Sequence, residues 1–507
     1  MSVVDRLQAL SPEQRALFEK LQRRRAPAPA GAPAPPPVAR VSGRSGLGDW
    51  PLTFDQERLI WLHEMDPGLV SWNVDAGSRV TGNLDLPALR GALRLLVVRH
   101  AAWRTVFPRV EGRRVQRVVG WLEPEVARLD LEALPVVRRR AEGLRAIYGH
   151  TRQPFDLERG PLLRVAVVRL AAREHLFLLT IHHLVTDWIT FQVFFRELSV
   201  LYQALLAGLP ASAAERLLPG IPVQFPDFAV WERQWIGGDM LAAEAEIWRR
   251  RLDGFPLALD LPADRPRPPV QSQRGGLHHV AAGAERTRRL RALARAEGAT
   301  PFMAVLAVLY ALVWRLTGRD RVVVGSNAAN RPRPEVEAVA GCFLTQVPFA
   351  ADLGGDPTFR ELLARSRRAA LDVYSRPGLP FSKLIEAVAG EAVAADRSRN
   401  PIVQVLLLIL ESNPPGAEAA LHFEPLVLFD GNSRWDLMFG LYDDHDRGLD
   451  GALEYNADIF DAATVAAFLD LFYRLIDAVV ADPDLRLSQL PAAPMSAGPA
   501  GANAGGR

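Results

Sequence analysis

The sequence predicts an α/β protein built as two lobes, and three observations support this fold class. Stretches with helical periodicity, such as residues 86–98, alternate with short apolar segments typical of buried strands, at residues 165–170, 322–324 and 402–410. The chain of 507 residues is longer than one hydrophobic core normally serves. A stretch rich in Gly, Pro and Ala at residues 207–222 indicates the boundary between two lobes.

These observations divide the chain into five parts. We expect a first lobe over residues 48–215 and a second lobe over residues 216–490. Residues 1–25 predict a short helix that begins with a Ser-Pro cap, and it is either a docking element or a solubilising tail. Residues 26–47 are rich in Pro and Ala and predict a stiff, unpacked linker, whereas residues 491–507 predict a disordered tail.

Composition limits the classes of function. The formal net charge is only +2, and no basic stripe interleaved with aromatic residues is present, which argues against a nucleic-acid-binding surface. Cys342 is the only cysteine, so intrachain disulfides and cysteine-based zinc sites are excluded, and its apolar neighbours favour a core position. No segment resembles a secretion signal or a membrane span, and we therefore expect a cytoplasmic protein.

The most informative chemistry lies in His182, His183 and Asp187. The histidines end the apolar run of residues 176–181, which predicts a buried strand. Either Thr186 or Asp187 can cap the helix that follows as far as Gly208. Successive strand side chains point to opposite faces, so one imidazole is expected to act in a cavity while the other packs. Imidazole is suited to general base chemistry because its pKa lies near neutral pH.

Two simpler interpretations of these residues stay open. The histidines could be satisfied core residues, with Asp187 serving only as a helix cap. They could also be ligands of a metal enzyme together with Asp187, although side chains on opposite strand faces make a poor chelate and we expect no metal.

Residues 182–188 resemble the active-site motif of nonribosomal peptide synthetase condensation domains, in which two His, three variable residues, Asp and Gly follow one another. Segments similar to six further condensation motifs occur in family order, so the resemblance covers residues 48–490. The seven segments are residues 52–62, 99–107, 182–188, 226–231, 339–346, 379–381 and 396–402.

Two residues depart from the family pattern. Trp188 stands where the motif has Gly, and we expect it to narrow the substrate channel and alter substrate geometry. Thr345 stands where the fifth motif carries Asn, with Gln346 following, so any hydrogen bond made by the family's Asn amide is in doubt. Trp188, Thr345 and Gln346 are the predicted channel residues.

The resemblance implies two chloramphenicol acetyltransferase-like lobes that form a V-shaped pseudodimer with a central tunnel. His183 would be the base, or would position the nucleophile, while His182 packs and Asp187 pairs with an arginine. Either Arg315 or Arg331 could be that partner, and Arg104, within the second motif, is expected to support the site structurally.

The implied reaction joins a carrier-bound acyl or peptidyl group to an amine or hydroxyl acceptor, giving an amide or ester. The group would arrive as a thioester on the 4'-phosphopantetheine arm of a carrier protein. The enzyme would be a monomer that needs no cofactor of its own. Three alternative functions stay open: an acyltransferase with a soluble acceptor, a non-catalytic recruitment module, and an epimerising enzyme.

Overall fold

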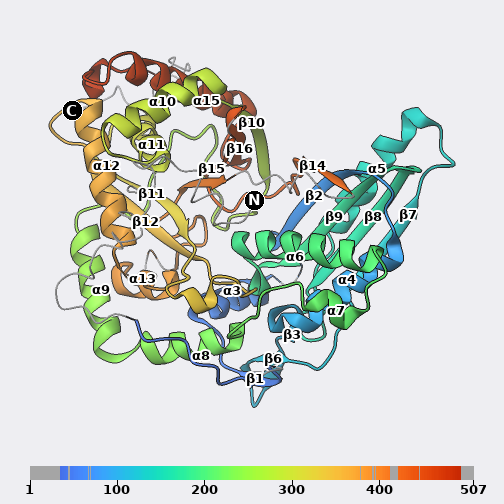
Figure 1. The fold of residues 1–507 in the computed structure, drawn as a ribbon. Coiled ribbons are helices and arrows are strands. Elements are labelled where there is room, and N and C mark those ends of the chain that lie inside the picture. The colour runs from blue at the N-terminus through green and yellow to red at the C-terminus, as the bar shows by residue number, and fades with distance from the viewer. Residues whose placement is uncertain are drawn as a thin grey trace.

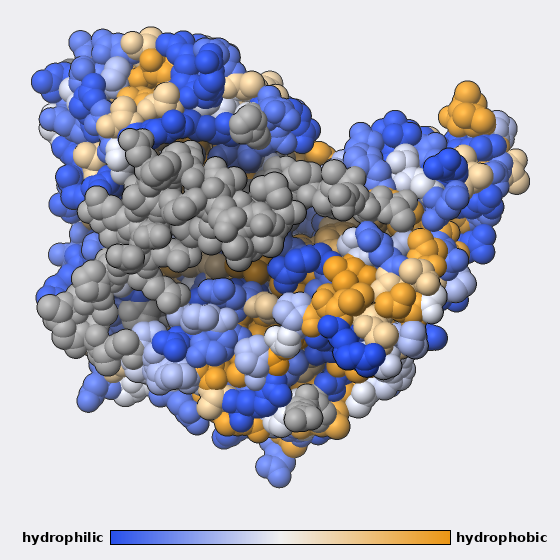
Figure 2. Space-filling view, viewed as in Figure 1, coloured by the Kyte–Doolittle hydropathy of each residue, from blue (hydrophilic) through white to orange (hydrophobic). Residues whose placement is uncertain are grey.

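The computed structural model describes residues 35–43, 46–66, 68, 70–376, 378–390, 393, 395–411, 421–444 and 446–492. The expected N-terminal helix and the tail after residue 492 lie outside these residues. Figure 1 shows two halves, each made of a sheet with helices, that diverge upward from a base containing α3 (Phe54–Met65) and α8 (Phe225–Trp235). Figure 2 shows that their upper ends remain separated by a notch in the surface. The predicted α/β class with two lobes is confirmed.

The sheet of the N-terminal half has five strands, and its central strand β9 leads to the predicted site. Alternate residues of β8 and β9 face opposite sides, as strand geometry requires. Val165 and Leu179 pack in the core with helices α4 and α6, whereas Val168 and Leu178 pack with Ile147 of α5. In spatial order the strands are β14 (His422–Leu426), β2 (Asn73–Thr81), β9 (Glu174–His182), β8 (Leu163–Ala171) and β7 (Glu125–Asp130). The helices are α4 (Leu86–Arg99), α5 (Val136–Thr151), α6 (Trp188–Leu206) and α7 (Ala211–Glu215).

The C-terminal half contains a six-stranded sheet, and its largest core lies between that sheet and four helices. Helix α11 is buried along most of its length in this core, as its apolar sequence predicts. In spatial order the strands are β10 (Gly275–Ala281), β16 (Gly448–Asn456), β15 (Leu437–Asp444), β13 (Val405–Glu411), β11 (Arg321–Ala328) and β12 (Thr345–Asp352). The helices around that core are α10 (Ala284–Ala296), α11 (Pro301–Thr317), α12 (Phe359–Tyr374) and α15 (Ala462–Ala481), while α9 (Gly238–Leu252) and α13 (Phe381–Val388) contribute to a smaller cluster on the other face.

Short elements complete the described chain. Strands β1 (Gly48–Trp50), β6 (Gln116–Val118) and β3 (Thr105–Val106) form one small sheet, and β4 (Arg109–Val110) pairs with β5 (Arg113–Arg114). The 3-10 turns are η1 (Ala101–Arg104), η2 (His183–Val185), η3 (Pro334–Val336) and η4 (Leu487–Gln489).

The predicted lobe boundary at residues 215 and 216 is wrong in detail, because segments that follow it belong to the first core. Phe225 and Phe228 of α8 and Phe343 pack together within the hydrophobic core of the N-terminal half. Strand β14 also pairs with β2 and extends the N-terminal sheet. The chain therefore crosses between the halves repeatedly, since apolar side chains from distant segments complete one core.

The predicted linker is also wrong where the structure describes it, because it packs against α8. The Trp231 indole N–H donates to the Pro36 carbonyl at 2.9 Å. The backbone N–H groups of Val41 and Ser42 both donate to one Asp227 carboxylate oxygen at 2.7 Å. Val38 is buried. A Pro- and Ala-rich composition did not prevent packing, because side chains of α8 supply partners for the backbone of the segment.

Among the described residues, no single helix combines the length and the apolar composition of a membrane span. Helices α10 and α11 meet those criteria only when taken together, and they are bent by 104°.

Candidate active site between the two halves

A strand, a short turn and a helix position the two histidines, as the sequence predicted, and His183 lines the cavity. Strand β9 ends at His182, turn η2 begins at His183, and α6 begins at Trp188. The Asp187 carboxylate accepts from the Thr190 N–H at 2.7 Å and caps α6. The His183 N–H donates to the Trp72 carbonyl at 2.8 Å, which fixes the backbone where the strand gives way to the turn.

The two imidazoles have different surroundings. His182 is buried, its Nδ1 accepts from the Leu184 N–H at 3.2 Å, and its ring meets those of His63 and Phe155 edge-on. Burial lowers the pKa of His182 to about 3, so this ring is neutral. His183 is half-buried and lines a cavity instead. One histidine packs while the other faces the space in which chemistry can occur.

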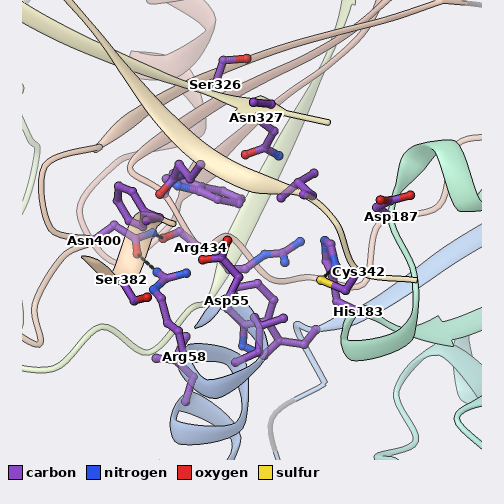
Figure 3. Close-up of a pocket in the computed structure, with 18 of the residues that line it drawn as sticks. Asp55, Arg58, His183, Asp187, Ser326, Asn327, Cys342, Ser382, Asn400 and Arg434 are labelled. Carbon is purple, nitrogen blue, oxygen red and sulfur yellow. Dashed lines mark hydrogen bonds between the residues drawn. The ribbon is translucent and has the colours of Figure 1, made fainter. Parts of the chain in front are cut away.

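The cavity has a volume of about 1090 Å³ and is bounded by both halves and by α3. Figure 3 shows His183, Cys342, Asp55, Arg58 and Arg434 around it. This volume is in the range that holds a substrate larger than a single amino acid.

His183 is held as a neutral base. Burial, and second the positive charge of Arg434, lower the pKa of His183 to about 4, although hydrogen bonding to backbone and the charge of Asp187 act in the opposite direction. The Nδ1 atom lies 3.8 Å from Cys342 Sγ. In the tautomer that carries its proton on Nδ1, Nε2 is the ring nitrogen that accepts a hydrogen bond from a substrate.

The arginine partner of Asp187 is Arg331. One Arg331 nitrogen, Nη2, lies 3.0 Å from each Asp187 carboxylate oxygen, and both side chains are buried. The other, Nη1, donates to the carbonyls of Val336 and Val339 at 2.6 and 2.7 Å. The second candidate, Arg315, instead donates to the Ser488 and Leu490 carbonyls at the far side of α11. The sequence did not distinguish Arg315 from Arg331 as the partner of Asp187, and the tertiary structure does.

Asp187 also organises the loop that carries Cys342. The Phe343 N–H donates to Asp187 Oδ2 at 3.2 Å. The Thr190 hydroxyl donates to the Gly341 carbonyl at 2.9 Å and accepts from the Gly341 N–H at 3.1 Å. The first turn of α6 therefore holds this loop, which packs into the core of the N-terminal half, and the loop sets the Cys342 thiol against the His183 ring. Burial raises the pKa of that thiol, so it stays protonated.

Arg104 is buried outside the cavity, as a structural residue would be. Its Nη1 donates to the Val119 carbonyl at 2.8 Å, next to the small sheet formed by β1, β6 and β3. It supports the base of the N-terminal half and does not line the site.

Trp188 occupies the first position of α6 and lines the cavity. Its ring centroid lies 6.0 Å from that of Tyr442 on β15. This aromatic pair spans from the N-terminal half to the C-terminal sheet. A glycine at position 188 would leave the space of the indole open.

Thr345 and Gln346 begin β12 and differ in what they contact. The Thr345 hydroxyl accepts from the Phe381 N–H at 3.1 Å and also bonds the Asp55 side chain. Gln346 lines the cavity. Burial raises the pKa of Asp55 to about 6, while the Thr345 hydroxyl and Arg58 favour its charged form. Thr345 thus anchors α13 and a cavity carboxylate that the sequence analysis did not assign.

Two further cavity residues were missed from the sequence, Asp55 and Arg434. Asp55 stands inside the first motif, so its place in α3 was predictable, whereas its exposure to the cavity was not. Arg434 lies in an irregular segment before β15, with no periodicity or spacing to mark it. Only the approach of the two halves brings it near His183.

The fold and the half-buried histidine define a two-lobed α/β protein of the chloramphenicol acetyltransferase type. The family model "Condensation domain" matches residues 47–496, and the chain belongs to the condensation-domain family. This confirms the resemblance to condensation domains of nonribosomal peptide synthetases and the chloramphenicol acetyltransferase-like fold of the two lobes.

Similar proteins include one protein of the linear gramicidin synthase of Brevibacillus parabrevis, which is 36% identical over 87% of this chain and 6% of its own length. Phosphinothricin tripeptide synthetase PhsC of Streptomyces viridochromogenes is 35% identical over 96% of this chain and 44% of its own length. This chain thus spans less than half of either relative. Among solved structures, the X-domain of teicoplanin biosynthesis in complex with OxyB aligns with a TM-score of 0.77 and 28% identity, covering 91% of this chain and 99% of that chain.

Proposed function

We propose that this protein is a condensation enzyme that transfers an acyl or peptidyl group from a carrier-protein thioester to an amine or hydroxyl acceptor. The observation that carries the proposal is a neutral imidazole, that of His183, on the wall of a cavity between two halves of a condensation-domain fold. Such a cavity can receive two substrates and bring them together, which supplies rate through proximity.

The reaction needs no covalent enzyme intermediate. The acceptor nitrogen or oxygen attacks the thioester carbon while its proton is held by His183 Nε2. The tetrahedral intermediate collapses, the carbon–sulfur bond breaks, and the phosphopantetheine sulfur leaves and takes up a proton. A histidine whose pKa is about 4 is a weak base, so its main contribution is to position and polarise the nucleophile.

The other site residues hold His183 in place and shape the cavity around it. Asp187 and Arg331 fix the turn that bears His183 and the loop that bears Cys342. Trp188 and Gln346 shape the walls of the cavity, Thr345 holds α13 and the Asp55 carboxylate behind them, and His182 is buried away from the cavity. Donor and acceptor would arrive on phosphopantetheine arms, whose length suits a cavity remote from the surface of a carrier protein.

Intact-mass spectrometry of an acyl-loaded donor carrier tests the proposal. Each acceptor is offered twice, tethered to a second carrier and free in solution, so the two acyltransferase alternatives are separated. Transfer appears as loss of the acyl mass from the donor and an equal gain on the acceptor. We expect the rate of this transfer to be about a hundred to ten thousand fold lower in His183→Ala than in wild type. His422→Ala, which removes an exposed histidine on β14, is the matched control. Equal transfer by wild type and His183→Ala would contradict the assignment.

A recruitment module is the second candidate, and the likeness to the X-domain solved with OxyB favours it. The protein would then bind another enzyme and transfer nothing. Two results together would support that candidate: no acyl transfer with any donor and acceptor pair, and binding of the partner enzyme that is the same in His183→Ala as in wild type.

A further inference from the structure

Arg434 is a cavity arginine whose guanidinium is held by aromatic rings. Its Cζ atom lies 4.6 Å from the ring centroid of Trp72 in the N-terminal half and 5.1 Å from that of the adjacent Trp435. Figure 3 shows Arg434, Asp55 and His183 around the same part of the cavity. The two indoles restrain the guanidinium plane but leave its N–H groups without acceptors, because an aromatic face offers no lone pair.

No acceptor for this guanidinium is present among the residues that the structure describes. The hydrogen bonds that involve Arg434 are those of its backbone carbonyl, which accepts from Gln271 and Asn400 at 3.2 and 2.6 Å. Glu454 and Asp430 act on it only through their charges, and no ion pair to either falls within 4.0 Å. Arg331 in the same region has four acceptors within 3.0 Å. Arg434 is therefore a restrained cation with free donors in the cavity.

Trp72 places this cation beside His183. The Trp72 carbonyl accepts from the His183 N–H at 2.8 Å, and the two rings lie with centroids 6.1 Å apart. The same indole carries Arg434. The two side chains thus share one support, and the charge of Arg434 reaches the His183 ring strongly enough to lower its pKa.

Attack on a thioester also needs a hydrogen-bond donor to the carbonyl oxygen, and none of the residues discussed so far supplies it. As the acceptor nitrogen forms its bond to the carbonyl carbon, the carbon–oxygen π pair moves to oxygen and leaves an oxyanion. His183 cannot stabilise that charge, because as a neutral ring it accepts the proton of the nucleophile through Nε2. A preorganised cation with free N–H groups, partly removed from water, is the group that such an oxyanion requires.

We propose that Arg434 is a catalytic residue that donates hydrogen bonds to the oxyanion of the tetrahedral intermediate. When the oxygen pair re-forms the carbonyl, the carbon–sulfur bond breaks and its electron pair leaves on sulfur. The proton of the acceptor nitrogen passes through His183 Nε2 to that sulfur, which departs as a thiol. This inference rests on the proposed acyl transfer, and its test includes a binding measurement that needs no turnover.

The binding test compares an anionic probe with a neutral one. The first probe is a pantetheine derivative with a methylphosphonate monoanion in place of the acetyl thioester, and the second is the methyl sulfone of the same length. We expect wild type to bind the phosphonate at least tenfold more tightly than the sulfone in calorimetry. Arg434→Gln should abolish that preference and leave sulfone binding within twofold of wild type, whereas Arg434→Lys should retain part of it.

The kinetic test uses the carrier-bound reaction. Loss of one oxyanion donor typically lowers kcat by about 100 to 1000 fold. We expect Arg434→Gln to lower kcat by this factor while KM changes less than threefold. Arg434→Lys should have a kcat at least tenfold higher than that of Arg434→Gln. Arg140→Gln, which removes one exposed arginine from α5, is the control for the change in net charge. Thermal unfolding of each variant shows whether the substitution destabilises the fold.

The outcomes separate this inference from the proposed function. Equal loss of phosphonate and sulfone binding in Arg434→Gln would mean a structural clamp, and a loss confined to KM with carboxylate-bearing substrates would mean substrate recognition. Either result overturns the inference, as does the absence of any phosphonate preference in wild type. An Arg434-dependent preference in a protein that transfers no acyl group would overturn the proposed function and, with it, the catalytic role, and would leave Arg434 as an anion-binding residue.

Discussion

The Asp187 carboxylate and the Arg331 guanidinium meet across the two halves of the molecule, with one nitrogen 3.0 Å from both oxygens. The pair is 144 residues apart in sequence, and its side chains are 4% and 3% exposed. Asp187 uses its oxygens three ways, to cap α6, to bind Arg331 and to accept from the Phe343 N–H. One carboxylate thus joins the turn that bears His183 to the loop that bears Cys342.

Breaking this pair should destabilise the protein strongly. Asp187→Asn and Arg331→Gln should each lower the free energy of unfolding by about 3 to 5 kcal/mol, because each leaves a buried partner uncompensated. The double variant should lose less than the sum of the two, which urea unfolding would show as a coupling energy. The exposed pair Arg94–Glu123 is the control, and its disruption should leave the free energy of unfolding nearly unchanged because water screens the two charges. Additive losses at Asp187 and Arg331 would contradict direct coupling.

Trp188→Gly should enlarge the cavity and admit bulkier substrates. The indole of Trp188 lines the cavity and packs beside Tyr442, and glycine removes both the indole and that contact. We expect kcat/KM to rise about tenfold or more for acyl groups longer than the preferred one, since the added space relieves a steric clash. Competition assays with a series of acyl chain lengths measure this ratio. Tyr442→Phe, which keeps the ring, should leave the preference unchanged, and an unaltered preference in Trp188→Gly would show that the indole does not limit the substrate.

The His183 imidazole should remain neutral throughout the physiological range. Its pKa is lowered to about 4, chiefly by burial, so no protonation is expected between pH 5.5 and 8. The ring C–H signals in NMR spectra, assigned by their loss in His183→Ala, should therefore not shift over that range. Arg434→Gln removes one cause of the lowered pKa and should move the midpoint upward. A midpoint near 6.5 in wild type would mean that the ring is better solvated than its surroundings indicate.

The buried Glu232 should make stability depend on pH. Its carboxylate accepts from the Phe54 N–H at 2.9 Å at the start of α3, and burial raises the pKa of Glu232 to about 8. The folded protein then binds a proton that the unfolded chain releases above pH 4.5, so this contribution is complete below that pH and is lost as pH rises toward 8.

Glu232→Gln removes the titrating group and tests this dependence. The stability of wild type relative to the variant should fall by about 2 to 5 kcal/mol between pH 4.5 and 8. Urea unfolding of both proteins at each pH measures the difference, which cancels the titration of other groups. A difference that stays constant over this window would show that Glu232 ionises in the fold at an ordinary pH.

Local patterns were sufficient to predict the unit that delivers the histidines. The apolar run of residues 176–181 predicted β9, and helical periodicity predicted α6, both close to their observed bounds. Thr186 and Asp187 were both possible caps of that helix, and Asp187 is the residue that caps it. These predictions depend on interactions within about twenty residues, where side-chain direction is set by the backbone itself. The order of the seven motifs likewise identified the family, which the family model confirmed.

Contacts between distant segments needed the tertiary structure. The sequence determined the α/β class, the family, and that only one of the two adjacent histidines could face a given cavity. Only the packed halves decided that Arg331 and not Arg315 binds Asp187, that Cys342 lies against His183, and that residues 36–42 pack on α8. The reason is physical: these partners are chosen by the docking of two sheets and their helices, and that arrangement depends on many apolar contacts that leave no local pattern in the chain.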